Sequence, residues 1–278
     1  MWLIADSGST KTEWILFDST GQMQTVTTAG LNPLYLSETA FIAELEDPIL
    51  VDWASQVTRV WFYGAGCGDT KINYTTANWL KSFFVKAHVN VASDLLGAAR
   101  ATCGTSKGIV AILGTGSNSC YYDGKGIKMH IKPLGFILGD EGSGAALGKA
   151  LLKKLLRDEF SSNLSKLIYK EIGLDYHKII SKVYKEEWPN RFIASCAKAL
   201  FLYKEEAEIE KVLRKEFDTF TLLIKKYEST LKINLIGSIG FYFKDFIATS
   251  LQDQGLEIGK VLKSPTEALV GYHLQNKD

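Results

Sequence analysis

The chain has few of the residues that mark specialised classes of protein. It contains only four cysteines and five prolines among 278 residues. The cysteines are scattered, with no Cys-x-x-Cys pair, and the four histidines are dispersed as well. This spacing excludes a disulfide-stapled secreted scaffold and argues against a zinc or iron–sulfur site within the chain. We expect the cysteines to be reduced and mostly buried.

Long runs of one kind of residue are also missing. Lysine plus arginine (32) nearly balance aspartate plus glutamate (31), with no long run of like charge, which argues against nucleic acid or an anionic membrane as the main partner. No apolar stretch reaches the roughly 18 residues that span a bilayer. The first residues are typical of a strand, not of a signal peptide, so we expect a cytoplasmic protein. An apolar fraction of 46% is ordinary and allows two medium domains.

What the chain does have is two short glycine-rich loops, Asp6–Thr12 and Gly114–Ser119, each lying between two apolar strands. Glycine lets the backbone approach an anion closely, and consecutive N–H groups with Ser/Thr hydroxyls form a phosphate nest. Both loops lead into a strand, whereas Walker and Rossmann loops lead into a helix. The pair therefore predicts a polyphosphate site made by one hairpin unit that occurs twice.

The patterns along the chain predict an α/β protein with mixed sheets. A first domain over residues 1–105 contains expected helices starting at Ser37 and covering 77–85 and 94–103. A second domain over residues 106–278 contains a helical insertion at about 143–228 and a helix from about Tyr242. Its last helix packs either within this domain or back on the first domain. Expected strands cover residues 2–5, 12–17, 23–28, 59–63, 88–92, 109–113, 117–122, 127–131, 232–236 and 256–261.

The order of the motifs resembles the sugar kinase, Hsp70 and actin superfamily of ATPases, and more closely the BadF/BadG/BcrA/BcrD ATPase family, which includes the N-acetylglucosamine kinases. Asp6–Thr12 and Gly114–Asn118 are similar to its two phosphate loops. Gly139–Gly144 is similar to the Gly-Asp-Glu-Gly-Ser signature of the N-acetylglucosamine kinase branch, and Leu235–Gly240 resembles the adenosine motif. The resemblance covers nearly the whole chain and is weakest over residues 160–227. It implies two ribonuclease H-like (actin/hexokinase-type) domains, each a mixed sheet flanked by helices, with an interdomain cleft that closes on the sugar.

The resemblance implies ATP and Mg²⁺ as cofactors. Asp6 would organise the metal, although a carboxylate there could instead cap the hairpin. Lys11 is either a phosphate ligand or a lysine that points to solvent. The implied ATP-binding residues are Gly8, Ser9, Thr10, Lys11, Thr115, Gly116, Gly237 and Ser238.

The implied sugar site is built around Asp94, which follows an expected strand and opens an expected helix. A carboxylate there can act as general base for a sugar hydroxyl, and it can also serve as an N-cap; the two roles are compatible. Asn32 is either a turn residue before proline or a sugar ligand. Asp140 is either a helix-start residue or an acceptor for sugar hydroxyls. The implied sugar-binding residues are Asn32, Asp94, Ser117, Asn118, Gly135 and Asp140.

The sequence therefore predicts ATP-dependent phosphorylation of an amino sugar, with N-acetylglucosamine 6-phosphate as the leading product. Leu134-Gly135-Phe136 stands where the vertebrate pattern has Trp-Gly-His, and Ser7 and Ser9 replace glycines common in that branch. The first departure leaves N-acetylmuramic acid, glucosamine and N-acetylmannosamine as alternative substrates. A BadF-type ATPase that activates another enzyme and a non-catalytic sensor are alternatives of other classes. The expected partners are a small sugar and ATP, without nucleic acid or membrane, and a homodimer is left open.

Overall fold

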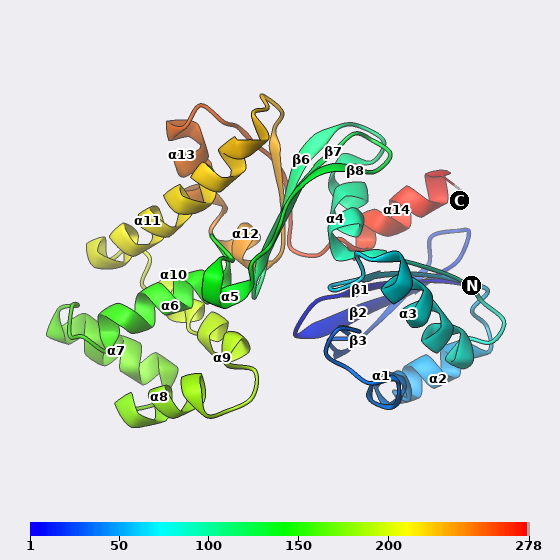
Figure 1. The fold of residues 1–278 in the computed structure, drawn as a ribbon, viewed down its shortest axis with the longest axis horizontal. Coiled ribbons are helices and arrows are strands. Elements are labelled where there is room, and N and C mark those ends of the chain that lie inside the picture. Colours follow the sequence, from blue (N-terminus) through cyan, green and yellow to red (C-terminus); the bar gives the residue numbers. More distant parts are fainter. Residues whose placement is uncertain (277–278) are drawn as a thin grey trace. The chain divides into compact units, whose positions relative to one another are not determined.

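The computed structural model describes residues 1–276, which form two compact units. Unit 1 contains residues 1–106, 123–127 and the C-terminal segment from Ser264, and unit 2 contains residues 107–122 and 128–263. Each unit is built around its own five-stranded sheet (Figure 1). The predicted fold class is confirmed, because both sheets are mixed and both are flanked by helices.

The sheet of unit 1 has the strand order β3-β2-β1-β4-β5. Its first three strands form an antiparallel meander, and β4 and β5 run parallel to β1. In this register Asp6 is paired with Tyr63, and Tyr63 with Ala92. The carboxyl ends of the parallel strands therefore bring Asp6 and the start of the next helix, at Asp94, to the same edge. The strands are β1 (Trp2–Ser7), β2 (Lys11–Phe17), β3 (Met23–Ala29), β4 (Arg59–Gly64) and β5 (His88–Ser93).

Helices cover both faces of this sheet (Figure 1). On one face lie α1 (Glu38–Leu45), α2 (Pro48–Ala54) and α3 (Thr70–Phe83), and on the other α4 (Asp94–Cys103) and α14 (Thr266–Asn276). The sequence did not predict α2, and it placed the start of α3 seven residues late. Asp69 starts α3 by accepting the backbone N–H groups of Lys71 and Ile72, a capping pattern that the sequence reading passed over.

A buried aromatic cluster fixes α14 to this sheet. The Tyr63 hydroxyl lies 2.8 Å from His273 Nε2, and the imidazole stacks on Trp61 with 4.1 Å between ring centres. Arg100 donates to the Tyr63 hydroxyl at 2.9 Å. Burial, with the nearby charges of Arg100 and Arg59, lowers the pKa of His273 to about 3. The imidazole is therefore neutral at neutral pH and acts as a packing and hydrogen-bonding group.

The sheet of unit 2 repeats the topology of unit 1. Its order is β10-β9-β6-β7-β8, with β6 antiparallel to β7 and parallel to β9. Read from the hairpin side, it matches β3-β2-β1-β4-β5 strand for strand. The repeat seen in the two glycine-rich loops thus extends to whole sheets. The strands are β6 (Gly108–Leu113), β7 (Ser117–Tyr122), β8 (Ile127–Ile131), β9 (Ile233–Ile236) and β10 (Ile258–Leu262).

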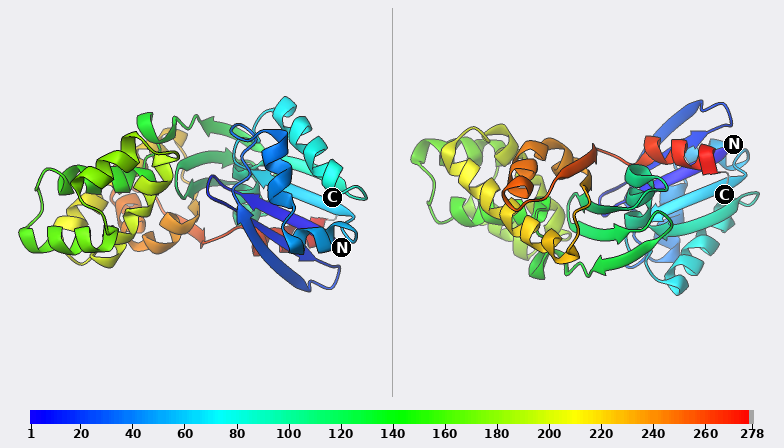
Figure 2. Two further views of the ribbon diagram at one scale, coloured as in Figure 1. Left: turned by 90° about the horizontal axis from the view of Figure 1, so that it is seen from below. Right: turned by 90° about the horizontal axis from the view of Figure 1, so that it is seen from above.

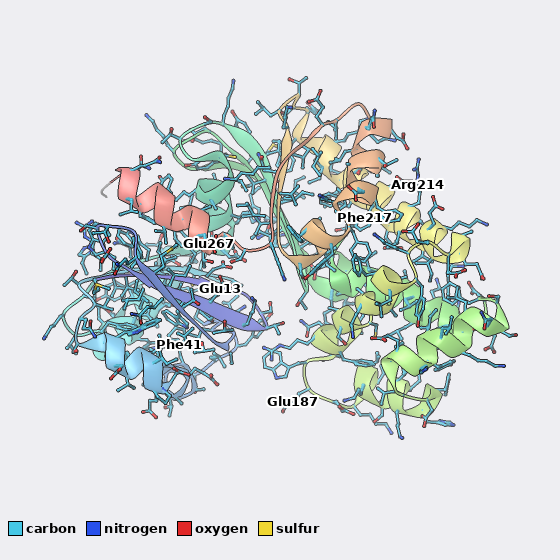
Figure 3. All side chains as sticks on the ribbon, turned by 180° about the vertical axis from the view of Figure 1, so that it is seen from behind. Glu13, Phe41, Glu187, Arg214, Phe217 and Glu267 are labelled. Carbon is cyan, nitrogen blue, oxygen red and sulfur yellow. The ribbon has the colours of Figure 1, made fainter. Side chains whose placement is uncertain are left out.

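Apolar residues recur at helical spacing in two stripes of the sequence, which predicts two buried helix faces. The helical part of unit 2 buries both stripes, Leu147, Leu151 and Leu155 in one and Ile209, Leu213, Phe217, Phe220 and Ile224 in the other. The two stripes pack together in one cluster, and Figure 3 shows Phe217 of the second stripe in this helical part. The helices are α5 (Gly135–Leu138), α6 (Gly144–Leu155), α7 (Ser162–Ile172), α8 (Tyr176–Tyr184), α9 (Pro189–Ser195), α10 (Ala197–Leu202), α11 (Ala207–Ile224), η1 (Lys225–Tyr227), α12 (Ser238–Tyr242) and α13 (Lys244–Asp253). Within this unit, α7 and α8 lie at the end away from the strands (Figure 2).

Two expectations for unit 2 need correction. The short helix α12, which begins at Ser238 directly after Gly237, was not predicted, whereas the helix expected from about Tyr242 corresponds to α13, which begins at Lys244. The segment Gly135–Leu138, for which the sequence predicted no helix, forms one turn of helix. Among the helices of residues 1–276, none has both the length and the apolar character needed to cross a membrane.

Candidate functional site

The first glycine-rich loop is a tight turn between β1 and β2. The Gly8 N–H donates to the Lys11 carbonyl at 3.0 Å, which closes the turn. Below it, the hydroxyls of Ser7 and Thr12 lie 2.8 Å apart, and the Leu31 N–H donates to Ser7 Oγ at 2.9 Å. Both hydroxyls are buried and fasten the segment after β3 to the base of the loop. The serine that replaces a glycine at position 7 therefore has a structural role.

Gly30 supports the same loop from its other side. Its N–H donates to the Thr10 carbonyl at 3.2 Å. A Cβ at this position would lie 2.5 Å from the Gly8 carbonyl oxygen and 2.8 Å from the Ser9 carbonyl carbon. Only glycine allows this approach of backbone to backbone. Gly30 was not singled out from the sequence. Its position directly after an expected strand is the feature that could have indicated a close approach of two backbone segments.

Replacing Gly30 with alanine is expected to displace Gly8 and Ser9, because the added methyl group meets backbone atoms that cannot rotate away. We expect an increase of about tenfold in the KM for ATP and a loss of about 1–3 kcal/mol in the free energy of unfolding. Steady-state kinetics and denaturant unfolding measure the two effects. Gly68→Ala is the matched control, since its Cβ would meet nothing within 4 Å. Equal ATP kinetics in the two variants would contradict a role for this loop in nucleotide binding.

Two carboxylates, of Asp6 and Glu13, and the ammonium of Lys11 lie beside the first loop. Asp6 and Glu13 face each other across the β1–β2 pair. Glu13 Oε2 lies 3.4 Å from the exposed Lys11 ammonium, and its Oε1 accepts the Ser264 hydroxyl at 3.1 Å and the Thr266 hydroxyl. Figure 3 shows Glu13 beside the beginning of α14, where Glu267 lies. The sequence reading missed Glu13 because its partners Ser264 and Thr266 are more than 250 residues away along the chain.

Of these side chains, the Asp6 carboxylate has the negative charge that its surroundings compensate least. Burial first, then the charges of Asp94 and Glu13, raise the pKa of Asp6 to about 8, and Lys11 only partly opposes them. Within residues 1–276 no hydrogen bond to the Asp6 carboxylate is found, whereas a carboxylate that caps a hairpin would accept one from the turn. An oxygen ligand surrounded by uncompensated negative charge suits Mg²⁺. In the same described part, no three Asp, Glu, His or Cys side chains are grouped to hold a metal, so phosphate oxygens and water would complete the shell.

Asp94 is placed as an available carboxylate at the start of α4. The N-cap of this helix is Ser93, whose hydroxyl accepts the Leu96 N–H at 3.2 Å, so Asp94 is not itself the cap. Its Oδ1 accepts the Leu95 N–H at 2.8 Å. Burial raises the pKa of Asp94 to about 6, and the backbone hydrogen bonds partly offset this rise. Asp94 is therefore mostly ionised at neutral pH and keeps useful basicity.

Asn32 is buried, with only 8% of its surface exposed. Its side-chain oxygen accepts the Leu34 N–H at 3.0 Å, and its backbone carbonyl accepts from Tyr35 and Leu36 at 3.1 Å each. Asn32 is thus a turn residue, as one of the two readings had it. The amide nitrogen is the part of the side chain that these bonds do not use, so the sugar-ligand reading stays a prediction.

The second glycine-rich loop in unit 2 is held by the helix that follows it. The carbonyls of Gly114 and Thr115 accept the N–H groups of Gly144 and Ala145, at 2.8 and 3.0 Å. Gly237 approaches from β9 with φ of +108°, and a Cβ there would lie 2.8 Å from the Leu113 carbonyl carbon. Thr115, Gly116 and Gly237 are therefore assembled in one place, next to Ser238, the exposed first residue of α12.

The Gly139–Gly144 motif has a physical explanation in this unit. Asp140 has a φ of +61°, a conformation that costs energy for a residue with a Cβ. Gly142 has a φ of +74° and lies where a Cβ would be 2.8 Å from Phe220 Cβ. Ser143 caps α6 by accepting the Ala146 N–H at 3.2 Å. The motif thus turns the chain sharply into α6 and holds the Asp140 carboxylate against Gly116, whose Cβ would lie 2.8 Å from Asp140 Oδ2.

A pocket of about 170 Å³ opens beside this carboxylate. Three predicted sugar-binding residues line it together: Ser117, Asn118 and Asp140. The Ser117 N–H donates to Asp140, whose pKa is nevertheless raised by burial. Gly135 is not among the lining residues, although its neighbour Leu134 is. The other lining residues are Ser119, Ile131, Lys132, Pro133, Glu141, Phe220, Leu223 and Lys226.

Comparisons with known proteins find relatives over the whole length of the chain. The proposed N-acetylglucosamine kinase of Porphyromonas gingivalis is 37% identical over 100% of both chains, with a TM-score of 0.96. The proposed N-acetylglucosamine kinase of Chromobacterium violaceum is 18% identical, with 98% and 99% of the two chains covered and a TM-score of 0.71. A ROK family glucokinase from Streptomyces griseus, solved with glucose and AMPPNP, is 16% identical, with 98% and 97% covered and a TM-score of 0.62. These last two likenesses concern the fold alone. No protein-family model and no curated protein matches the chain.

Proposed function

Because the chain belongs to the N-acetylglucosamine kinase-like family of sugar kinases, we propose that it transfers the γ-phosphoryl group of ATP to the 6-hydroxyl of N-acetylglucosamine. The family makes it a phosphotransferase with a hydroxyl group as acceptor. The observation that carries the sugar proposal is the unit 2 pocket, in which Ser117, Asn118 and Asp140 meet at the end of the Gly139–Gly144 motif. The use of ATP is supported by the nucleotide analogue in the Streptomyces griseus relative.

The residues of the chain divide the work of phosphoryl transfer. Asp94 orients the acceptor hydroxyl and takes its proton late in the transfer, as its pKa of about 6 allows. In unit 1 the loop Gly8–Thr10 would offer phosphate oxygens its backbone N–H groups other than that of Gly8, which donates to the Lys11 carbonyl. In unit 2 the loop Thr115–Gly116 would offer its own N–H groups. Asp6 would hold Mg²⁺ when it is bound, and the ion would neutralise charge that develops on the phosphates. Asp140 accepts hydrogen bonds from sugar hydroxyls.

A second substrate is favoured by two lysines of the same pocket. Lys132 and Lys226 both line it, and both side chains reach solvent. The same pocket is also lined by the carboxylates of Asp140 and Glu141. N-acetylglucosamine has no charged group to pair with a lysine, whereas the lactyl carboxylate of N-acetylmuramic acid would pair with whichever lysine these carboxylates leave unneutralised. N-acetylmuramic acid is therefore the second candidate substrate.

The test is an ADP-release assay with the four amino sugars named above. We expect sugar-stimulated turnover, with the highest kcat/KM for N-acetylglucosamine or N-acetylmuramic acid, and ³¹P–¹H correlation places the phosphate on the 6-oxygen. If Lys132→Ala and Lys226→Ala lower kcat/KM for N-acetylmuramic acid alone, the result supports N-acetylmuramic acid as the substrate. ATP binding without stimulation by any sugar would overturn the kinase proposal and favour a sensor.

A further inference from the structure

We propose that His130 is a positioning residue that makes the Asn118 side chain an obligatory hydrogen-bond donor to the sugar. Asn118 lies on β7 at the pocket, and His130 lies on the neighbouring strand β8. His130 is not a pocket-lining residue, so it acts through Asn118. This inference rests on the proposed sugar kinase function and names a residue that sets its specificity.

The contacts around the Asn118 amide all involve its oxygen. Asn118 Oδ1 lies 2.8 Å from His130 Nε2 and accepts the Ser119 N–H at 3.0 Å. Turning the amide over would place its NH2 group against these two donors and lose both hydrogen bonds. The oxygen is therefore fully used, and within residues 1–276 the amide nitrogen has no protein partner. Only the nitrogen is left for a ligand.

The state of the imidazole allows this arrangement. The His130 side chain is exposed, but its partial desolvation still lowers the pKa of the imidazole below its usual value. With its proton on Nε2, the neutral ring donates to Asn118, and the protonated ring donates there as well. The orientation of Asn118 is therefore kept on either side of the histidine titration.

A fixed donor beside a fixed acceptor recognises one kind of group. Asp140, when ionised, is an acceptor only, and it already takes the Ser117 N–H. A hydroxyl can accept from Asn118 and donate to Asp140 at the same time, which a hydrogen or an ether oxygen at the same carbon cannot do. Asn118 and Asp140 together thus select a sugar that carries a free hydroxyl in this part of the pocket. The selection acts on the binding of the sugar and not on the rate of phosphoryl transfer.

The experiment compares His130→Ala, His130→Gln and Asn118→Asp with the wild type. His130→Ala is expected to raise the KM for the sugar about five- to tenfold, with kcat and the KM for ATP changed less than twofold, because one hydrogen bond to the ground state is weakened. His130→Gln keeps an N–H donor and should recover most of the loss. His88→Ala is the matched control, since His88 is an exposed strand histidine that pairs with Asn90 at 3.2 Å in unit 1.

A double variant separates positioning from a general structural effect. Asn118→Asp removes the donor itself, so adding His130→Ala to it should raise the sugar KM no further. The proposal is overturned by an unchanged sugar KM in His130→Ala, by a loss that Gln does not recover, or by additive losses in the double variant. A wild type without sugar-stimulated ADP release would instead overturn the proposed function, so the two failures are distinguishable. If His130→Ala does not fold, the His130→Gln and Asn118→Asp measurements and their combination decide.

Discussion

Replacing Asp94 with asparagine is expected to lower kcat for sugar phosphorylation about 10³-fold, within the range that a general base contributes. The substitution keeps the size of the side chain and an oxygen that can accept the Leu95 N–H, which now bonds Oδ1 at 2.8 Å. The N-cap of α4 is untouched, because Ser93 supplies it. What is lost is the negative charge and the ability to take the proton of the sugar hydroxyl.

The pH profile gives this prediction a second readout. With the pKa of Asp94 at about 6, kcat/KM of the wild type should fall about tenfold per pH unit below pH 6. Asp94→Asn should lack this limb, because its residual turnover does not depend on that carboxylate. A variant with the same acid limb as the wild type would show that another group is the base.

Stability separates a lost base from a damaged fold. The pKa of Asp94 is raised from 3.8 to about 6 on folding, so the native state binds more protons than the unfolded state between these values. The ionised carboxylate therefore lowers wild-type stability as pH rises through this window, and the cost stays above it. Asp94→Asn should unfold at the same or a higher temperature at pH 7. Asp52→Asn, on the exposed side of α2, is the control for kinetics and melting.

The sequence predicted the parts of the fold that local patterns determine. Alternating apolar strands with glycine turns predicted both hairpins, and the Leu147 and Ile209 stripes predicted buried helix faces that the structure confirms. The short helix α2 and the one-turn helix α5 were missed, because four to seven residues carry too little periodicity to be recognised. The start of α3 was placed late because its first turns are mostly polar.

The residues of the candidate site also fall into those that the sequence predicted and those that only the structure shows. Asp6, Asp94 and Asp140 could be named from the sequence because each stands at a position that resembles a functional position of the family. Glu13 and His130 could not, because each acts through a neighbour on another strand or a distant segment: Glu13 binds Ser264 and His130 binds Asn118. Gly30 belongs with them, since only the packed backbone shows what a Cβ would strike.

Replacing Asp6 with asparagine is expected to abolish the response of the protein to Mg²⁺ and to lower kcat/KM by about 100-fold or more. An amide oxygen is a weaker ligand for a hard cation than a carboxylate, and the charge that balances the ion is lost. The pKa of about 8 sharpens the expectation, because Mg²⁺ must displace a proton from Asp6 at neutral pH. In the wild type the apparent affinity for Mg²⁺ should therefore rise between pH 6 and pH 8 and then level off.

Two measurements check this without relying on turnover alone. With a non-hydrolysable ATP analogue present to supply phosphate oxygens, the melting temperature with and without Mg²⁺, followed from pH 6 to pH 8, should show a stabilisation by the metal that grows with pH in the wild type and is absent in Asp6→Asn. Without Mg²⁺ the order reverses, since a pKa raised from 3.8 to about 8 means that the ionised Asp6 destabilises the native state as pH rises. The variant should then be the more stable protein at pH 8, and replacing the exposed Asp245 of α13 with asparagine should leave the wild-type behaviour unchanged. If Asp6→Asn kept the Mg²⁺-dependent stabilisation, the metal would be held by other groups, and Glu13, directly across the β1–β2 pair, would be the carboxylate to test.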